Sequence, residues 1–291
     1  MGSLKEIKSR IQSVKSTQKI TSAMKMVSSA KLRKAQKNIE NFYPYNQSVM
    51  RILNNFLRAE TEITSVFAEN REVKRIAIVA FSSNGSLNGA FNSNVAKRLA
   101  AVINEYKHLG QENILIFPIG KKVHKATRKM EFTPQGNYED MSDKPNYKQA
   151  QELADQIMDL YINGQIDKVI LVYHHFKSRS SQELVDETLI PIELNSTITD
   201  DDSKMKLNYI VEPDRDTIIQ GLIPKVIRLR LYTALLDSAA SEHAARVMAM
   251  QIATDNADDL LQELSLQYNK SRQQAITNEL LDIIGGSFGQ Q

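Results

Sequence analysis

The last third of the chain carries mostly apolar positions that alternate between spacings of three and four residues. This seam consists of Leu222, Val226, Leu229, Thr233, Leu236, Ala240, His243, Val247, Met250, Thr254, Ala257, Leu261, Leu264 and Tyr268. A seven-residue repeat held over more than four heptads predicts a helix that supercoils in a left-handed sense around a partner. The predicted helix, 213–286, is roughly 100 Å long at 1.5 Å per residue. Pro213 suits its first turn, Pro224 is expected to bend it, and Gly285-Gly286 is expected to end it.

The N-terminal stretch supplies a partner for this helix. Its apolar positions are Leu4, Ile7, Ile11, Val14, Met24, Leu32, Ala35, Ile39 and Phe42. Between them, Gln18, Thr21 and Ser28 weaken the seam. Pro44 is expected to kink or end the helix near Tyr43. Ordinary bundle packing explains such stripes in helices of about 8–20 residues, but both stretches are much longer.

The middle of the chain has a different period, with short apolar runs alternating with amphipathic stretches. The runs predict strands at Arg75–Phe81, Asn113–Phe117, Lys168–Tyr173 and Glu183–Glu193. The stretches predict helices at Ser93–His108, Lys121–Met130 and Asn146–Asn163. This alternation indicates an α/β fold. We therefore expect an antiparallel coiled coil of residues 1–58 and 213–286, with a Rossmann-like α/β domain, residues 74–194, inserted between its helices.

Composition limits the classes of protein to be considered. The chain has 291 residues, 42% of them hydrophobic, which is enough for one or two domains with a core. It has no run of about 18 apolar residues and no apolar N-terminal core, so we expect no transmembrane helix and no secretory signal. The first helix is basic and amphipathic, as transit peptides are, but it continues too far and too regularly for a removable segment. The absence of cysteine excludes disulfides and cysteine-ligated metals, which fits a reducing compartment.

Charge is distributed unevenly. Residues 1–40 contain ten Lys or Arg against two Glu, a net charge of +8, whereas the whole chain carries +3 and the remainder therefore −5. Such a run is often a solvated face. The functional alternative is a basic helix that faces an acidic partner, a nucleic acid or anionic lipid.

Candidate chemistry is sparse. The turn Ser82–Asn92 follows a predicted strand, but its glycines match neither the dinucleotide fingerprint nor the phosphate loop. His174 and His175 are adjacent in an extended segment, so they point to opposite faces and cannot share a metal. Consecutive helical residues such as Ser241-Glu242-His243 make poor triad geometry. We therefore expect no catalytic residues, no cofactor and no metal site.

Long blocks at both ends resemble the gamma-subunit family of F-type ATP synthases. The N-terminal block is Leu4 to Ile11 followed by Thr17 to Ser28. The C-terminal blocks are Ser241 to Met250, Ala253 to Ala257, Tyr268 to Gln273 and Ile276 to Leu280. The Ser82–Asn94 turn is also similar, although Asn84 and Ser86-Leu87-Asn88 stand where members of the family often carry acidic and basic residues. The lack of a chloroplast-type insertion favours a bacterial-type member.

The resemblance implies a function. In this family the antiparallel helices stand inside a ring of alpha and beta subunits, and the α/β domain rests on the membrane c ring beside the epsilon subunit. Ion flow turns the shaft, which changes nucleotide affinity at the catalytic beta subunits. The resemblance thus implies a non-catalytic rotor, peripheral on the cytoplasmic face of a bacterial inner membrane, with no nucleic-acid partner and no membrane insertion of its own.

The resemblance also implies roles for individual residues. Met24 matches a position where lysine disturbs coupling. Polar positions near the contact with the beta subunits are matched by Arg246, Arg272, Gln273 and Thr277. The foot on the c ring is matched by Tyr209 and Glu212. The turn that runs in the apolar bearing is matched by Leu280, Leu281, Ile283 and Ile284.

Two alternatives remain open from the residues alone. A coiled-coil binding module would use the basic helix for nucleic acid or anionic lipid, although no aromatic residues for base stacking occur before Phe42. An enzyme would use residues 74–194 as a nucleotide-binding fold.

Overall fold

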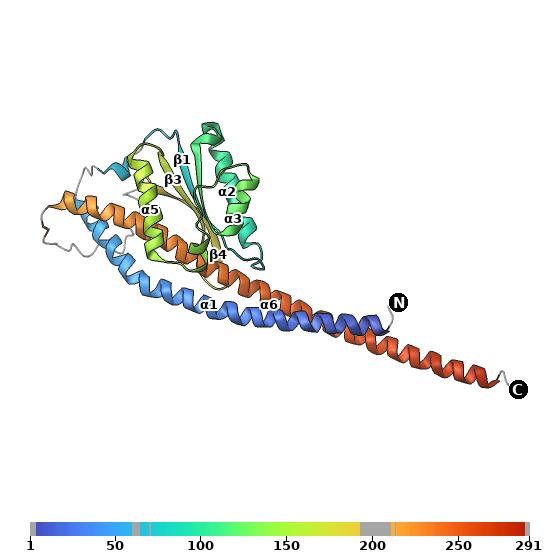
Figure 1. Ribbon diagram of the computed structural model, residues 1–291. Helices are drawn as coiled ribbons and strands as arrows, with labels where there is room; N and C mark the ends of the chain where they lie inside the picture. The colour runs from blue at the N-terminus through green and yellow to red at the C-terminus, as the bar shows by residue number, and fades with distance from the viewer. Residues whose placement is uncertain (1–3, 60–64, 70, 193–210, 213, 289–291) are drawn as a thin grey trace. The chain divides into compact units, whose positions relative to one another are not determined.

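The computed structural model describes residues 4–59, 65–69, 71–192, 211–212 and 214–288 (Figure 1). They form two compact units, Met1–Ser29 with Arg246–Gln291 and Ala30–Ala245. We call these the tip unit and the sheet unit. Two long helices, α1 (Leu4–Ala59) and α6 (Arg215–Phe288), each contribute a segment to both units.

In the tip unit, α1 and α6 form an antiparallel pair. Residues of rising number in α1 meet residues of falling number in α6, because Gln18 bonds to Asp258 and Thr21 to Thr254. The buried positions are Ile7, Thr21, Ser28, Val247, Met250, Thr254, Ala257 and Leu264. The predicted pairing and seam are therefore confirmed in this unit.

The sheet unit contains four strands in the order β2-β1-β3-β4. They are β1 (Ile76–Phe81), β2 (Ile114–Ile119), β3 (Lys168–Phe176) and β4 (Gln182–Ile190). β1 pairs in parallel with both β2 and β3, and β4 is antiparallel to β3. All four predicted strands are confirmed, with boundaries shifted by a few residues. All six residues of β1 are buried because helices cover both faces of the sheet.

Helices cover the two faces of this sheet (Figure 1). The outer face carries α2 (Phe91–Glu105) and α3 (Lys121–Lys129), and the inner face carries α5 (Tyr147–Ile162) with segments of α1 and α6. A short helix that the sequence did not predict, α4 (Glu139–Asp143), precedes α5. The side chain of Asn146 caps α5 by accepting a hydrogen bond from the Lys148 N–H at 2.8 Å.

Alternating side chains of the central strand divide the core into two parts. Ile76, Ile78 and Ala80 enter the outer core with α2 and α3. Ala77, Val79 and Phe81 enter the larger inner core with α5, α1 and α6. Single 3-10 turns connect these elements at Val66–Ala68 (η1), Lys107–Leu109 (η2) and Gln111–Asn113 (η3).

The helix α1 continues through Pro44 to Ala59, close to the expected limit at residue 58, so this proline does not end the helix. Proline in a helix costs about 3 kcal/mol. The turns that follow bury Val49, Leu53 and Phe56. Each such burial contributes about 1.5–3 kcal/mol, which offsets the proline.

At the other end of the chain, α6 continues past Gly285-Gly286 to Phe288, so these glycines do not end it. A helical glycine costs only about 1 kcal/mol relative to alanine, which does not by itself end a helix. Pro224 also lies inside α6, near its start.

Candidate functional site

The middle of the tip-unit seam is held by hydrogen bonds across the two helices. The Gln18 side-chain amide donates to Asp258 Oδ1 at 2.7 Å, and the Thr21 and Thr254 hydroxyls are 2.9 Å apart. Lys25 Nζ donates to Gln251 Oε1 at 2.9 Å. Two of the polar residues that were expected to weaken the seam, Gln18 and Thr21, therefore have hydrogen-bond partners across it, and these bonds set how the helices face each other.

Beyond this pair, α6 extends as a single helix. Because the numbers of the bonded residues add up to 275 or 276, Leu4 at the start of α1 lies level with about Ser271. From residue 272 to 284 every α6 side chain except Ala275 is exposed. The exposed apolar residues here are Ile276, Leu280, Leu281, Ile283 and Ile284, with 47–69% of their surface exposed. Such a concentration of apolar surface on one helix indicates a surface that another protein covers.

In the sheet unit, α6 closes the carboxyl edge of the parallel strands. Open α/β sheets bind ligands at this edge. Here Phe81, Ser82 and Ile119 face Ser238 and Glu242 of α6 across a gap that leaves no space for a water molecule. The site at which a nucleotide would be sought is filled by protein.

The polar turn after β1 is likewise occupied by its own hydrogen bonds. Asn84 Oδ1 accepts from the Lys121 N–H and its amide donates to the Glu139 carbonyl, both at 2.8 Å. The Ser83 N–H donates to Asn92 Oδ1 at 3.1 Å. The backbone N–H groups of Ser83 and Lys121 are therefore already bonded within the chain.

Two ion pairs and one histidine–aspartate contact, which together we call the clamp, hold α6 within the sheet unit. Arg228 bonds to Asp155 of α5 at 2.5 Å. Arg230 lies 3.4 Å from Glu187 of β4 and donates to the Thr188 carbonyl. Because these partners lie on different elements, α6 is fixed both along its axis and about it.

The third contact of the clamp is a hydrogen bond between the Asp237 carboxylate of α6 and the His175 ring of β3, at 2.5 Å. Asp237 is 4% exposed, and its burial raises the pKa of the carboxyl group, although the His175 contact lowers it in part. Burial also raises the pKa of the neighbouring Tyr173 hydroxyl well above its ordinary value. This clamp therefore places a titratable carboxyl group inside the joint between the sheet and α6.

His174 points to the opposite face of β3, as predicted. Its ring stacks on Phe91 of α2 with the ring centroids 4.4 Å apart, and burial lowers its pKa to about 4. The Ser241 hydroxyl donates to the His174 carbonyl at 3.1 Å. Among the described residues, no group of three or more His, Asp or Glu is placed to hold a metal.

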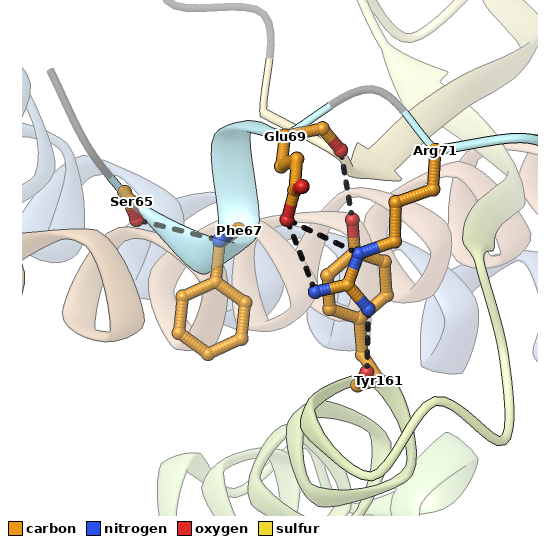
Figure 2. Close-up of polar contacts among 5 residues, drawn as sticks. All are labelled: Ser65, Phe67, Glu69, Arg71 and Tyr161. Atoms are coloured by element: carbon orange, nitrogen blue, oxygen red, sulfur yellow. Dashed lines mark hydrogen bonds and ion pairs between the residues drawn. The ribbon is translucent and has the colours of Figure 1, made fainter.

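The segment that precedes β1 is fastened to α5 through one tyrosine (Figure 2). The Tyr161 hydroxyl donates to the Glu69 carbonyl at 3.1 Å, and Arg71 donates to the Tyr161 carbonyl at 3.3 Å. The Arg71 guanidinium lies 4.8 Å from the centre of the Tyr161 ring and pairs with Glu69 at 3.3 Å. Phe67 stacks on the same ring. Burial raises the pKa of Tyr161, which keeps the hydroxyl protonated as a donor.

The residues that were expected to contact other subunits differ in how exposed they are. In the tip unit Met24 and Arg246 are half-buried, whereas Arg272, Gln273 and Thr277 are exposed. The bearing residues Leu280, Leu281, Ile283 and Ile284 are exposed on the same helix. Glu212 is exposed in the sheet unit just before α6, and Tyr209 lies outside the described residues. Their proposed contacts with other subunits remain predictions.

Two features were not predicted from the sequence: the clamp, and the contacts by which Tyr161 holds the segment before β1, which we call the tyrosine anchor. Arg228 and Asp155 are separated by 73 residues, and Tyr161 and Glu69 by 92. No local pattern connects such pairs. The one available signal was the set of charged residues within an otherwise apolar stretch of α6, since buried charges require partners.

The sequence matches the ATP synthase family over residues 3–288. An ATP synthase gamma chain of Bacteroides thetaiotaomicron is 56% identical, covering 99% of this chain and 100% of that protein. An ATP synthase gamma chain of Bacteroides fragilis is 57% identical with the same coverage.

Solved structures share the fold. A chain of the Euglena gracilis mitochondrial ATP synthase, from a structure of OSCP, F1 and the c-ring, has a TM-score of 0.67 at 20% identity. The match covers 98% of this chain and 94% of that one. A chain from the central stalk and c-ring of the Tetrahymena thermophila enzyme has a TM-score of 0.57 at 23% identity, covering 80% and 99%. No described helix is long and apolar enough to cross a membrane.

Proposed function

The chain belongs to the gamma-chain family of ATP synthases, and we propose that it acts as the rotating central shaft of such an enzyme. In this role it couples ion-driven rotation of a membrane c ring to ATP synthesis or hydrolysis in the beta subunits. The observation that carries the proposal is α6 itself. Its segment in the sheet unit is enclosed and clamped, and its last turns expose apolar side chains.

The exposed apolar turn supports a bearing. Leu280, Leu281, Ile283 and Ile284 offer no directional hydrogen bonds, so a smooth apolar sleeve can surround them at any angle of rotation. We propose that the alpha and beta subunits form this sleeve. The polar positions Arg272, Gln273 and Thr277 lie just before it and offer directional contacts that can differ between three beta subunits.

The clamp supports transmission of torque. Torque can be transmitted only if α6 does not rotate relative to the rest of the sheet unit. The ion pairs from α6 to both α5 and β4 resist such rotation. We propose that this unit rests on the c ring, with Tyr209 and Glu212 at the foot and an epsilon subunit beside it. The complex would then be peripheral on the cytoplasmic face of a bacterial inner membrane.

The filled carboxyl edge of the sheet supports a non-catalytic role for the chain. A nucleotide would have to displace α6 residues such as Ser238 and Glu242 from that edge. We propose that the nucleotide chemistry belongs to the beta subunits and that this chain contributes coupling free energy. Membership in the family removes the support for a coiled coil that binds nucleic acid or lipid.

The experiment is a charge substitution at Met24 in the assembled complex. Met24 is half-buried in the tip unit, and lysine there introduces a cation facing the sleeve. We expect Met24→Lys to lower ion pumping per ATP hydrolysed by about five-fold, at the lower end of allosteric coupling energies. Met24→Leu keeps an apolar side chain of similar volume and should leave the ratio unchanged.

Both variants should assemble with alpha and beta subunits, and co-purification measures this. If the Met24→Lys complex hydrolyses ATP and pumps ions at the wild-type ratio, the coupling role of this position is wrong.

A further inference from the structure

The end of α6 extends beyond its partner helix in the tip unit (Figure 1). The described part of α1 begins at Leu4, which lies level with about Ser271 of α6. We call residues 272–284 of α6 the overhang. Every side chain in the overhang except that of Ala275 is exposed. The overhang is therefore not stabilised by burial, which supplies most of the stability of helices in proteins.

The composition of the overhang favours a helix only weakly. Nearly half of its residues are β-branched or short polar ones, which form helices less readily than alanine, leucine or glutamate. These residues are Ile276, Thr277, Asn278, Asp282, Ile283 and Ile284. Gly285 and Gly286 follow inside the same helix, and glycine is less favourable still. The sequence of this end therefore supplies little helix stability of its own.

Charged groups do not compensate for this weakness. The last turn of α6 contains no basic residue that would interact favourably with the carbonyl groups there. The nearest charged residues before that turn, Glu279 and Asp282, are both acidic and lie three positions apart, a spacing at which like charges repel. Arg272 is seven positions from Glu279. An ion pair along one helix face needs a spacing of three or four positions, so Arg272 does not neutralise Glu279.

The preceding part of α6 is held by α1. Its buried positions in the tip unit are Val247, Met250, Thr254, Ala257 and Leu264. Thr254 and Asp258 also form hydrogen bonds to α1. Opening this part breaks contacts between two helices, whereas opening the overhang breaks chiefly the backbone hydrogen bonds of α6 itself. We therefore expect the local stability of α6 to fall beyond about Ser271.

We propose that the overhang opens readily in the free chain and becomes a stable helix only when other subunits enclose it. Burial of an apolar segment offsets the conformational entropy that the segment loses on becoming ordered. The apolar surface available for this burial is that of Leu280, Leu281, Ile283 and Ile284. The inference rests on the proposed shaft function, and it adds that the end of the shaft is completed during assembly.

Hydrogen exchange followed by mass spectrometry tests this on the full chain, both free and in the complex with alpha and beta subunits. In the free chain, we expect the amides of residues 276–284 to exchange within about ten-fold of the rate of an unstructured peptide. In the complex, the same amides should exchange at least about 100-fold more slowly. Slow exchange in both states would show that the helix is stable without partners, and fast exchange in both would show that enclosure does not order it. Either result overturns the proposal.

The paired part of α6 provides an internal control. The amides of residues 250–264 should exchange slowly in the free chain as well as in the complex, because α1 covers this part in both. Fast exchange there in the free chain would remove the contrast between the two parts of α6, and the proposal would fail with it.

A pair of alanine substitutions separates helix formation from contact with other subunits. Asn278 and Asp282 are exposed, and neither belongs to the proposed bearing or to the proposed contacts with the beta subunits. Because alanine is the best helix former, Asn278→Ala with Asp282→Ala should slow exchange in the free overhang by about five-fold. The same variant should bind the alpha and beta subunits about five-fold more tightly, because less order remains to be gained on assembly. Unchanged affinity with slowed exchange would overturn the proposal.

The matched control makes the same two replacements in the paired part of the helix. Asn256 and Asp259 are also exposed, but the helix around them is already held by α1. Asn256→Ala with Asp259→Ala should therefore leave both exchange and affinity unchanged. A similar gain in affinity in this control would show that the gain does not come from helix formation in the overhang, and it would overturn the proposal.

The result is separable from the coupling role. If Met24→Lys lowers the pumping ratio but the overhang exchanges alike in the free chain and in the complex, the shaft function stands and ordering on assembly fails. If the overhang becomes ordered on assembly and Met24→Lys has no effect, the ordering stands and the coupling role of Met24 fails.

Discussion

One helix, α6, passes through two contrasting environments. From Leu222 to Ala245, in the sheet unit, none of its residues is exposed, because the sheet, α5 and α1 all pack against it. From residue 272 to 284, in the tip unit, every residue except Ala275 is exposed. Both segments are rich in leucine and isoleucine. The apolar character of a segment therefore allows it to be buried, but the elements around it decide whether this chain or a different protein covers it.

The contrast between the two segments of α6 is tested most strongly by replacing one leucine with alanine in each of them. Leu229 is completely buried in the sheet unit, and Leu281 is 61% exposed in the tip unit. Leu229→Ala should lower the free energy of unfolding by about 2–5 kcal/mol through lost burial and a residual cavity. Leu281→Ala should change it by less than about 0.5 kcal/mol. Urea unfolding of the full chain, followed by circular dichroism, measures both.

Similar losses for the two variants would mean that the chain itself covers the last turns of α6. The bearing proposal would then lose its support, because a turn packed within the chain cannot contact a sleeve.

A smaller effect is expected from the buried histidine of the sheet unit. Its folded pKa is lowered to about 4, below the ordinary value of about 6.5. The unfolded chain therefore binds a proton that the folded chain does not between pH 6.5 and 4, so stability falls as the pH falls through this window. The difference of about 2.5 units corresponds to about 3 kcal/mol at most.

His174→Phe should remove this pH dependence while keeping the aromatic contact with Phe91. Unfolding free energies measured at pH 7 and pH 4.5 would show it as a smaller difference in the variant. The control is His108→Gln, which removes an exposed histidine in place of the buried one. An unaltered dependence in His174→Phe would show that other groups cause it.

The smallest effect concerns the anchor of the segment before β1. Tyr161→Phe removes the hydroxyl that donates to Glu69 and keeps the buried ring. One neutral hydrogen bond contributes about 1 kcal/mol. We expect a loss of that size by urea unfolding, whereas Tyr43→Phe, at a residue 54% exposed, should change stability by less than about 0.5 kcal/mol. Equal losses would contradict the anchor.

Much of the fold could be predicted because its signals are local. The heptad seam predicted α6 and its pairing with α1. The change in the spacing of apolar residues predicted the four strands and three of the shorter helices. The sequence left open whether Pro44 kinks or ends α1. The helix continues because the packing of Val49, Leu53 and Phe56 outweighs the local cost of the proline. α4 was missed because a helix of five residues carries too little periodicity to detect.

The candidate site was less predictable. The apolar turn and polar positions at the end of α6 came from family resemblance, and the structure adds that they are exposed. The clamp and the filled carboxyl edge came only from the structure. Each depends on residues brought together from distant parts of the chain.

By itself, the sequence determined which segments become helices and strands, and that the two longest helices pair. Hydrophobic period is a property of neighbouring residues, so it needs no tertiary context. The faces of α6 that are covered, and the places where its charges are neutralised, became known only from the folded structure. Burial and charge pairing depend on contacts such as Arg228 with Asp155 and Arg230 with Glu187. These contacts exist only once the sheet unit has folded around the helix.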